Sequence, residues 1–83
     1  MFLYILKSLK DNGYYIGISQ NVKKRLLYHN NSRIRSTKNR RPFKIVYQEE
    51  CGLMLIARKR EKYLKSYKGC KEKLSLVENS EIV

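Results

Sequence analysis

Two apolar stretches near the start of the chain, separated by a turn signal, predict a β-hairpin. Residues 2–7 (FLYILK) and 14–18 (YYIGI) are rich in β-branched and aromatic residues, which favour strands. Between them, Asn12-Gly13 is a strong signal for a two-residue turn, because both central residues of such a turn need a positive φ. We therefore expect two short antiparallel strands joined by a tight turn.

The expected register places two tyrosines on one face of this hairpin. A two-residue turn pairs Asp11 with Tyr14, so opposing residue numbers have an odd sum. Because alternate residues of a strand point to opposite faces, Tyr4 then shares a face with Tyr15 and Gly17. A glycine inside a strand weakens it. Gly17 therefore indicates either a close approach by a ligand, or a bulge or packing gap under a helix.

The pattern then changes from alternation to helical spacing. Asn21 is a residue type that caps helices, and Val22, Leu26 and Leu27 form an apolar stripe that would face a core. We expect a helix over residues 22–30, ended by Asn30-Asn31, and then a polar, basic loop over residues 31–42.

The second half of the chain predicts one more strand and further helix. Residues 43–48 (FKIVYQ) alternate, and Pro42 is tolerated at the edge of such a strand. Residues 53–68 have helical spacing, and Gly69 stands where a left-handed residue would close the helix. A short final helix is expected over 71–77.

This order of elements predicts an α+β fold, with a small three-stranded antiparallel sheet flanked by helices. A chain of 83 residues buries only about 60–65% of its unfolded surface, so it has one thin core and no room for a second domain. We expect a single domain over residues 1–83, with its core in 2–70 and a tail at 79–83.

The charge of the chain indicates a polyanionic partner. Nineteen Lys and Arg stand against seven Asp and Glu, a net charge of +12, which favours nucleic acid or an anionic surface. No apolar run approaches the length that spans a membrane, so we expect nucleic acid and no membrane. The candidate phosphate contacts lie on the first helix and the following loop: Lys24, Arg33, Arg35, Lys38, Arg40 and Arg41.

The cysteines and the first residues of the chain exclude other classes. Cys51 and Cys70 are far apart and the chain has one His, so the spacing of a zinc site is missing. The opening residues lack the basic start and long apolar run of a secretion signal. We therefore expect a cytoplasmic protein with reduced thiols.

Two residues one turn apart on the first helix form a candidate phosphate site. Arg25 and His29 are four residues apart, so they project side by side. Arg can hold a phosphate with two hydrogen bonds, and His can donate to one or accept from it. From the residues alone, the solvated face of a helix in a basic protein is the more common setting for such a pair.

Glu61 is the acid whose position asks for an explanation. It follows Ala57 by four residues and precedes Leu64 by three, so it lies on the stripe expected to face inward, apart from the basic residues of that helix. A buried carboxylate needs a partner. The alternatives are an ion pair with Arg25 or a metal site, since Mg²⁺ is commonly held by one carboxylate with water and substrate phosphates.

Taken together, these segments resemble the GIY-YIG nuclease superfamily, in particular its small stand-alone bacterial members. The resemblance covers about residues 2–70. Tyr4 stands at the tyrosine of the first motif, whose Gly-Ile is Phe-Leu here, and "YIG" at 15–17 is an intact second motif. Two features of other members, a Lys near the second motif and a catalytic Asn after the Glu, have no counterpart.

The resemblance implies a metal-dependent endonuclease acting on DNA rather than RNA. It implies that Glu61 binds Mg²⁺ or Mn²⁺, that Arg25 contacts the scissile phosphate, and that Tyr4 or Tyr15 activates water with the help of His29. Any specificity would come from the structure of the substrate or from a partner protein. The alternative is a module of the same fold that binds nucleic acid without cutting it.

Overall fold

Three strands form the sheet in the part of the chain described by the computed structural model, residues 1–31, 37, 39–66 and 69–81. The strands are β1 (Phe2–Ser8), β2 (Tyr14–Ser19) and β3 (Phe43–Glu50), and the helices are α1 (Val22–Asn30), α2 (Met54–Lys65) and α3 (Cys70–Glu81). Both neighbours of the central strand β1 are antiparallel to it, in the order β2-β1-β3. The expected α+β fold is confirmed.

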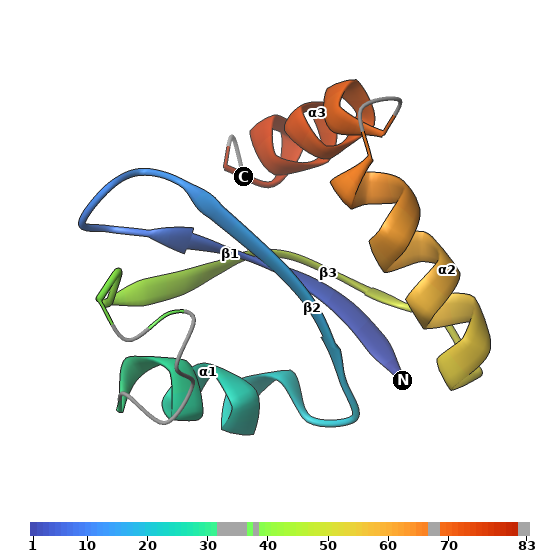
Figure 1. Cartoon of the computed structure of the whole chain (residues 1–83), viewed down its shortest axis with the longest axis horizontal. Coiled ribbons are helices and arrows are strands. Elements are labelled where there is room, and N and C mark those ends of the chain that lie inside the picture. The colour runs from blue at the N-terminus through green and yellow to red at the C-terminus, as the bar shows by residue number, and fades with distance from the viewer. Residues whose placement is uncertain (32–36, 38, 67–68, 82–83) are drawn as a thin grey trace.

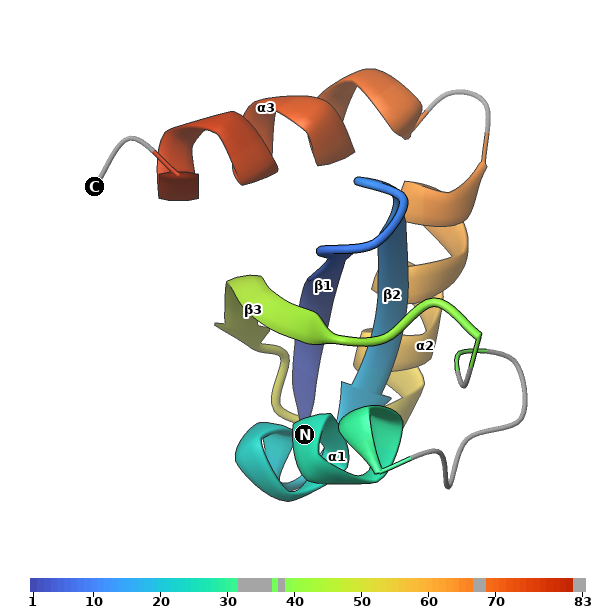
Figure 2. The same cartoon turned by 90° about the vertical axis from the view of Figure 1, so that its left-hand side faces the viewer.

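The two faces of the sheet are covered by different helices (Figures 1 and 2). We call the face that bears Tyr4, Tyr15 and Gly17 the tyrosine face, and α1 packs on it through Val22. The opposite face is covered by α2 and α3. Its core consists of Leu3, Ile5, Ile16, Val46, Leu64 and Val77.

The register of the hairpin differs from the expected one, although its parity is the same. Lys7, not Asp11, is the partner of Tyr14, so the connection is a wider loop than a two-residue turn. Asn12 has a positive φ of 60°, but the Ser8 hydroxyl accepts hydrogen bonds from the amides of Lys10 and Asp11. The backbone closes this wider loop at Ser8, whose amide donates to the carbonyl of Gly13 and whose carbonyl accepts from the amide of Asn12.

The capping prediction for α1 is confirmed. The Asn21 side chain accepts a hydrogen bond of 3.1 Å from the amide of Lys24, which satisfies one of the free amides at the start of the helix. At the other end the amide of Asn31 donates to the carbonyls of Leu27 and His29. The side chain of Asn30 bonds the backbone amide and carbonyl of Phe43, which fastens the end of α1 to the start of β3.

One expectation about the second long helix is confirmed and one is wrong. Ala57 and Leu64 of the inward stripe are buried, whereas Leu53, expected to begin the helix, precedes α2 and is 73% exposed. Gly69 does not close the helix in a left-handed conformation, since α2 ends earlier, at Lys65, and of the described glycines Gly52 is the one with a positive φ. A Cβ on Gly69 would lie 1.9 Å from the carbonyl oxygen of Tyr63, so glycine is needed there for a close approach.

The last helix is longer than expected. It runs from Cys70 to Glu81, through most of the segment predicted to be a tail, and residues 82–83 lie outside the described part. The Arg60 side chain of α2 bonds Glu49 of β3 and Glu72 of α3, each at 3.2 Å. This network joins α2, α3 and the sheet on the face opposite to the tyrosines.

Candidate active site

The tyrosine face is organised around a glycine. Tyr4 on β1 lies opposite Gly17 on β2, and a Cβ on Gly17 would be 2.6 Å from the Tyr4 hydroxyl oxygen. The missing side chain therefore makes room for the Tyr4 ring itself. The sequence left open whether a ligand or a feature of the packing explains Gly17. The space over Gly17 is filled by the protein's own tyrosine and not by a ligand.

A histidine from α1 meets this tyrosine. The Tyr4 hydroxyl and His29 Nε2 are 3.1 Å apart, and the other ring nitrogen of His29 is 2.8 Å from Thr37 Oγ1. All three residues are almost completely buried. The Tyr15 ring packs edge-on against His29, with centroids 4.7 Å apart, while Tyr15 itself is partly exposed. His29 is thus part of the cluster and not a residue of the solvated helix face.

The environment shifts the protonation of both buried groups. Burial lowers the pKa of His29 to about 4, with a smaller contribution from the charge of Arg25, so the imidazole is neutral at pH 7. Burial raises the pKa of Tyr4 to about 12 and Tyr15 adds to this, while a hydrogen bond from Arg25 acts in the opposite direction. At neutral pH the pair is therefore a phenol beside a neutral imidazole that can accept a hydrogen bond from it.

Arg25 and Glu61 reach the same tyrosine from different helices. Arg25 is on α1, one turn before His29, and its guanidinium is close enough to the Tyr4 hydroxyl to oppose the rise in the pKa of Tyr4. Glu61 is on α2, beside the edge strand β2, and its carboxylate contributes to the raised pKa of Tyr4. The structure therefore brings together Tyr4, Tyr15, Gly17, Arg25, His29 and Glu61.

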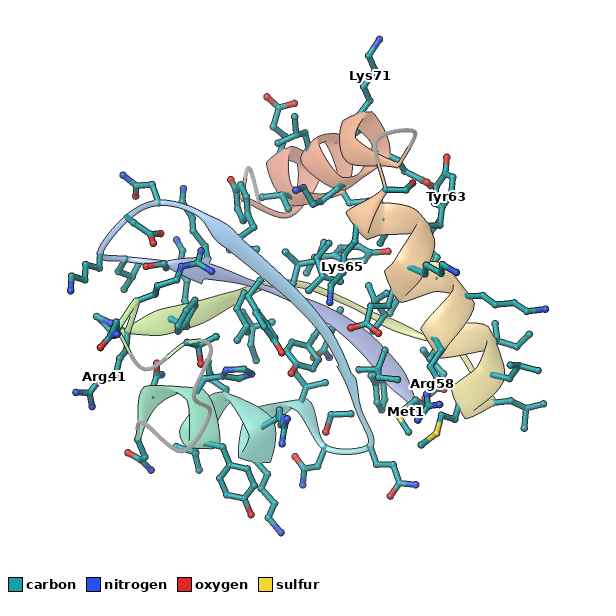
Figure 3. The ribbon with its side chains drawn as sticks, in the orientation of Figure 1. Met1, Arg41, Arg58, Tyr63, Lys65 and Lys71 are labelled. Atoms are coloured by element: carbon teal, nitrogen blue, oxygen red, sulfur yellow. The ribbon has the colours of Figure 1, made fainter. Side chains whose placement is uncertain are left out.

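The hydrogen-bond partner of Glu61 is a lysine of its own helix. Lys65 Nζ is 3.0 Å from Glu61 Oε2 and 5.8 Å from the centre of the Tyr15 ring. In Figure 3, Lys65 extends from α2 toward the sheet, whereas Tyr63 and Lys71 point away from it. The Glu61 side chain is 24% exposed, so this carboxylate lies at the open edge of the cluster and not in the core.

A divalent cation fits the donor set at this edge. Glu61 presents a partly exposed carboxylate, a hard oxygen ligand of the kind Mg²⁺ prefers, and a single carboxylate is typical when water and phosphate supply the other ligands. Among the residues that the structure describes, no three His, Cys, Asp or Glu side chains gather into a larger metal site. A cation would therefore be held by Glu61 and exchangeable oxygens.

The candidate phosphate contacts are placed only in part. Arg33, Arg35 and Lys38 lie outside the described residues. Arg40 pairs with Asp11 at 2.8 Å and donates to the carbonyl of Tyr14. It therefore joins the loop before β3 to the hairpin loop. Lys24 and Arg41 are exposed, and Arg41 projects outward beyond α1 in Figure 3.

Two members of the cluster were missed in the sequence. Lys65 follows Glu61 by four residues, which is the spacing of a helical ion pair, so it could have been found. Thr37 lies in an aperiodic polar loop, where nothing in the pattern distinguishes it from its neighbours. Its contact with His29 depends on how that loop returns to α1.

Comparison with known proteins gives consistent matches over the same segments. The family model described as the GIY-YIG catalytic domain matches residues 1–73. A UPF0213 protein of Staphylococcus saprophyticus is 39% identical over 77 residues, which cover 92% of each chain. A UPF0213 protein of Clostridium perfringens is 37% identical, covering 98% of this chain and 86% of its own.

No solved structure matches the chain significantly. Within the described part of the chain, no helix is long and apolar enough to cross a membrane.

Proposed function

The chain belongs to the GIY-YIG family, and on that basis we propose that it is a metal-dependent endonuclease that hydrolyses phosphodiester bonds, in DNA rather than RNA. The observation that carries the proposal is the contact of 3.1 Å between the Tyr4 hydroxyl and His29 Nε2, made where Arg25 and Glu61 also act on Tyr4. A proton acceptor, a cation for phosphate and a carboxylate for metal thus meet at one tyrosine.

In the proposed reaction, Tyr4 and His29 move the proton together. His29 donates from Nδ1 to Thr37 and accepts at Nε2 the proton of Tyr4, as Tyr4 takes a proton from the attacking water. A tyrosine with a raised pKa stays protonated at pH 7, so it passes its proton to the neutral imidazole as it takes one from water. The negative charge of the bound phosphate would then stabilise the imidazolium that forms. Because Tyr4 is buried, bulk water does not reach its hydroxyl. The water that Tyr4 deprotonates would therefore enter the site together with the bound phosphate.

The remaining residues act on the phosphate. Arg25 offsets the negative charge that grows on its oxygens in the transition state. A divalent cation bound to Glu61 would polarise the phosphate and stabilise the leaving oxygen. Tyr15, at the partly exposed side of the cluster, orients the substrate beside His29.

A cleavage assay tests this proposal directly. Labelled single-stranded, duplex, nicked and branched DNA, and RNA of matching sequence, are incubated with the protein in Mg²⁺, Mn²⁺ or EDTA. We expect metal-dependent cleavage of a DNA substrate. Glu61→Gln and Tyr4→Phe should abolish it, Tyr15→Phe should reduce it less, and Glu78→Gln, an exposed carboxylate on α3, should leave it unchanged.

One observation favours a second candidate, a module that binds nucleic acid without cutting it. Tyr4 is 1% exposed and its pKa is raised to about 12, both unfavourable for a base. If the wild-type protein binds these substrates but cuts none of them with any divalent metal, the binding module is the correct description.

A further inference from the structure

A small cavity lies on the tyrosine face beside the proposed catalytic cluster. Its volume is about 170 Å³, and it is lined by Phe2, Gln20, Asn21, Val22, Lys23 and Gln48. This is smaller than the roughly 300–1,000 Å³ of sites for whole small molecules. The cavity therefore suits one planar group of a larger ligand.

The cavity is next to Tyr4 in the sheet. Gln48 of β3 is the cross-strand partner of Tyr4, and paired residues share a face of the sheet. Phe2 precedes Tyr4 by two residues on β1, so it lies on the same face about 7 Å away along the strand.

The groups around the cavity match the chemistry of a nucleobase. Phe2 is partly exposed and offers an aromatic ring, on which bases stack. Gln20 and Gln48 are exposed, and carboxamides can donate to and accept from the edge of a base. Lys23 adds a positive charge for the adjoining phosphate.

The side-chain amides of the two glutamines are not used in hydrogen bonds that hold the described fold together. Asn21 uses its side-chain oxygen to cap α1, but within the described residues neither Gln20 nor Gln48 forms a side-chain hydrogen bond. Gln20, just before α1, and Gln48, on β3, thus border one cavity beside the Phe2 ring with amides that are available to a ligand.

We propose that this cavity binds one unpaired nucleobase next to the phosphate held by the catalytic cluster. The substrate would then be nucleic acid with an unstacked nucleotide at the cut, such as a single strand, flap or branch, since a base inside a duplex would first have to leave the stack. This inference rests on the proposed function for the position of the phosphate.

Binding without metal tests the cavity separately from cleavage. Fluorescence anisotropy in EDTA is measured for a labelled single-stranded DNA oligonucleotide about as long as one binding site, and for a set in which each position in turn is abasic. We expect one abasic position to weaken binding about five- to tenfold, the lower end of the range for one stacked base. We also expect a fully paired duplex to bind more weakly than the single strand.

The variants then locate the effect. Gln20→Ala with Gln48→Ala should reduce the penalty of the abasic position, because the base-edge contacts are lost while the stacking on Phe2 remains. Asn39→Ala, which removes an exposed amide from a loop, is the matched control and should keep it. Both glutamines are on the surface, so unfolding should not complicate the comparison, and melting curves check this.

The outcomes separate the two proposals. Equal binding of all abasic and intact strands, as expected if the cavity held only a phosphate, would overturn the nucleobase site even if the protein cuts DNA. An abasic penalty of unchanged size in the double variant would overturn it too. A penalty that the double variant reduces, in a protein that cuts nothing, would support the cavity and reject the nuclease.

Discussion

His29 couples the stability of the domain to pH. Its pKa is lowered to about 4 in the folded protein, against about 6.5 in an unfolded chain. The unfolded state therefore takes up a proton first as pH falls, so the contribution of neutral His29 is complete above about pH 6.5 and is lost toward pH 4. We expect the free energy of unfolding to drop by about 1–2 kcal/mol between pH 7 and pH 5, measured by urea titration.

A variant distinguishes this histidine from the carboxylates. Asp11 has its pKa lowered to about 2 by Arg40 and the Gly13 amide, so its contribution is lost below the window in which His29 titrates. His29→Gln should flatten the dependence between pH 7 and pH 5. An equal slope in wild type and variant would show that another group is responsible.

Lys65 competes with any cation for Glu61. Its ammonium lies 3.0 Å from Glu61 Oε2, and an exposed pair at this helical spacing is worth under about 1 kcal/mol. Lys65→Met keeps the aliphatic stem and removes the charge, so we expect Mn²⁺ to bind about two- to fivefold more tightly. Electron paramagnetic resonance of free Mn²⁺ measures this affinity and does not depend on nuclease activity. Lys62→Met, on the exposed side of α2, is the control. Equal Mn²⁺ affinity in both variants would contradict the binding of the metal at Glu61.

At the level of elements, the joint between α2 and α3 depends on Gly69. A Cβ there would lie 1.9 Å from a backbone oxygen of Tyr63, which cannot move without displacing the end of α2. We expect Gly69→Ala to lower the free energy of unfolding by about 1–3 kcal/mol, the usual effect of forcing extra atoms into a packed site. Urea titration measures it. Lys71→Ala on the exposed side of α3 should change little, and a neutral Gly69→Ala would contradict the close approach.

For the whole molecule, the net charge of +12 should make binding strongly dependent on salt. Lys24 on α1 and Arg41 in the following loop are exposed. Replacing both with Ala should weaken binding to all sequences alike and flatten the slope of log affinity against log salt by about one to two units. The paired control is Lys62→Ala with Lys71→Ala, on the outer side of α2 and on α3. Affinity that barely changes with salt would reject the electrostatic basis.

Much of the fold could be predicted because its signals are local. The strands at 2–7 and 14–18, the Asn21 cap and the break at Asn30-Asn31 depend on residues within a few positions of one another, and all agree with the structure. The shared face of Tyr4 and Tyr15 was also predictable, since parity survives any shift of register by an even number of residues. The length of the hairpin loop was not, because it depends on the Ser8 hydroxyl and on competing side-chain bonds.

The sequence by itself determined the strands, the first helix, the charge and the residue types of the site. Only the tertiary structure decided how those residues act: that the Tyr4 ring fills the space over Gly17, that His29 is buried between Tyr4 and Thr37, and that Glu61 pairs with Lys65 at an open edge. The spacing of apolar residues along a strand or helix indicates which face of that element a side chain lies on. Burial, pKa and partner depend on what the other elements place against it, and those contacts join residues far apart in the chain.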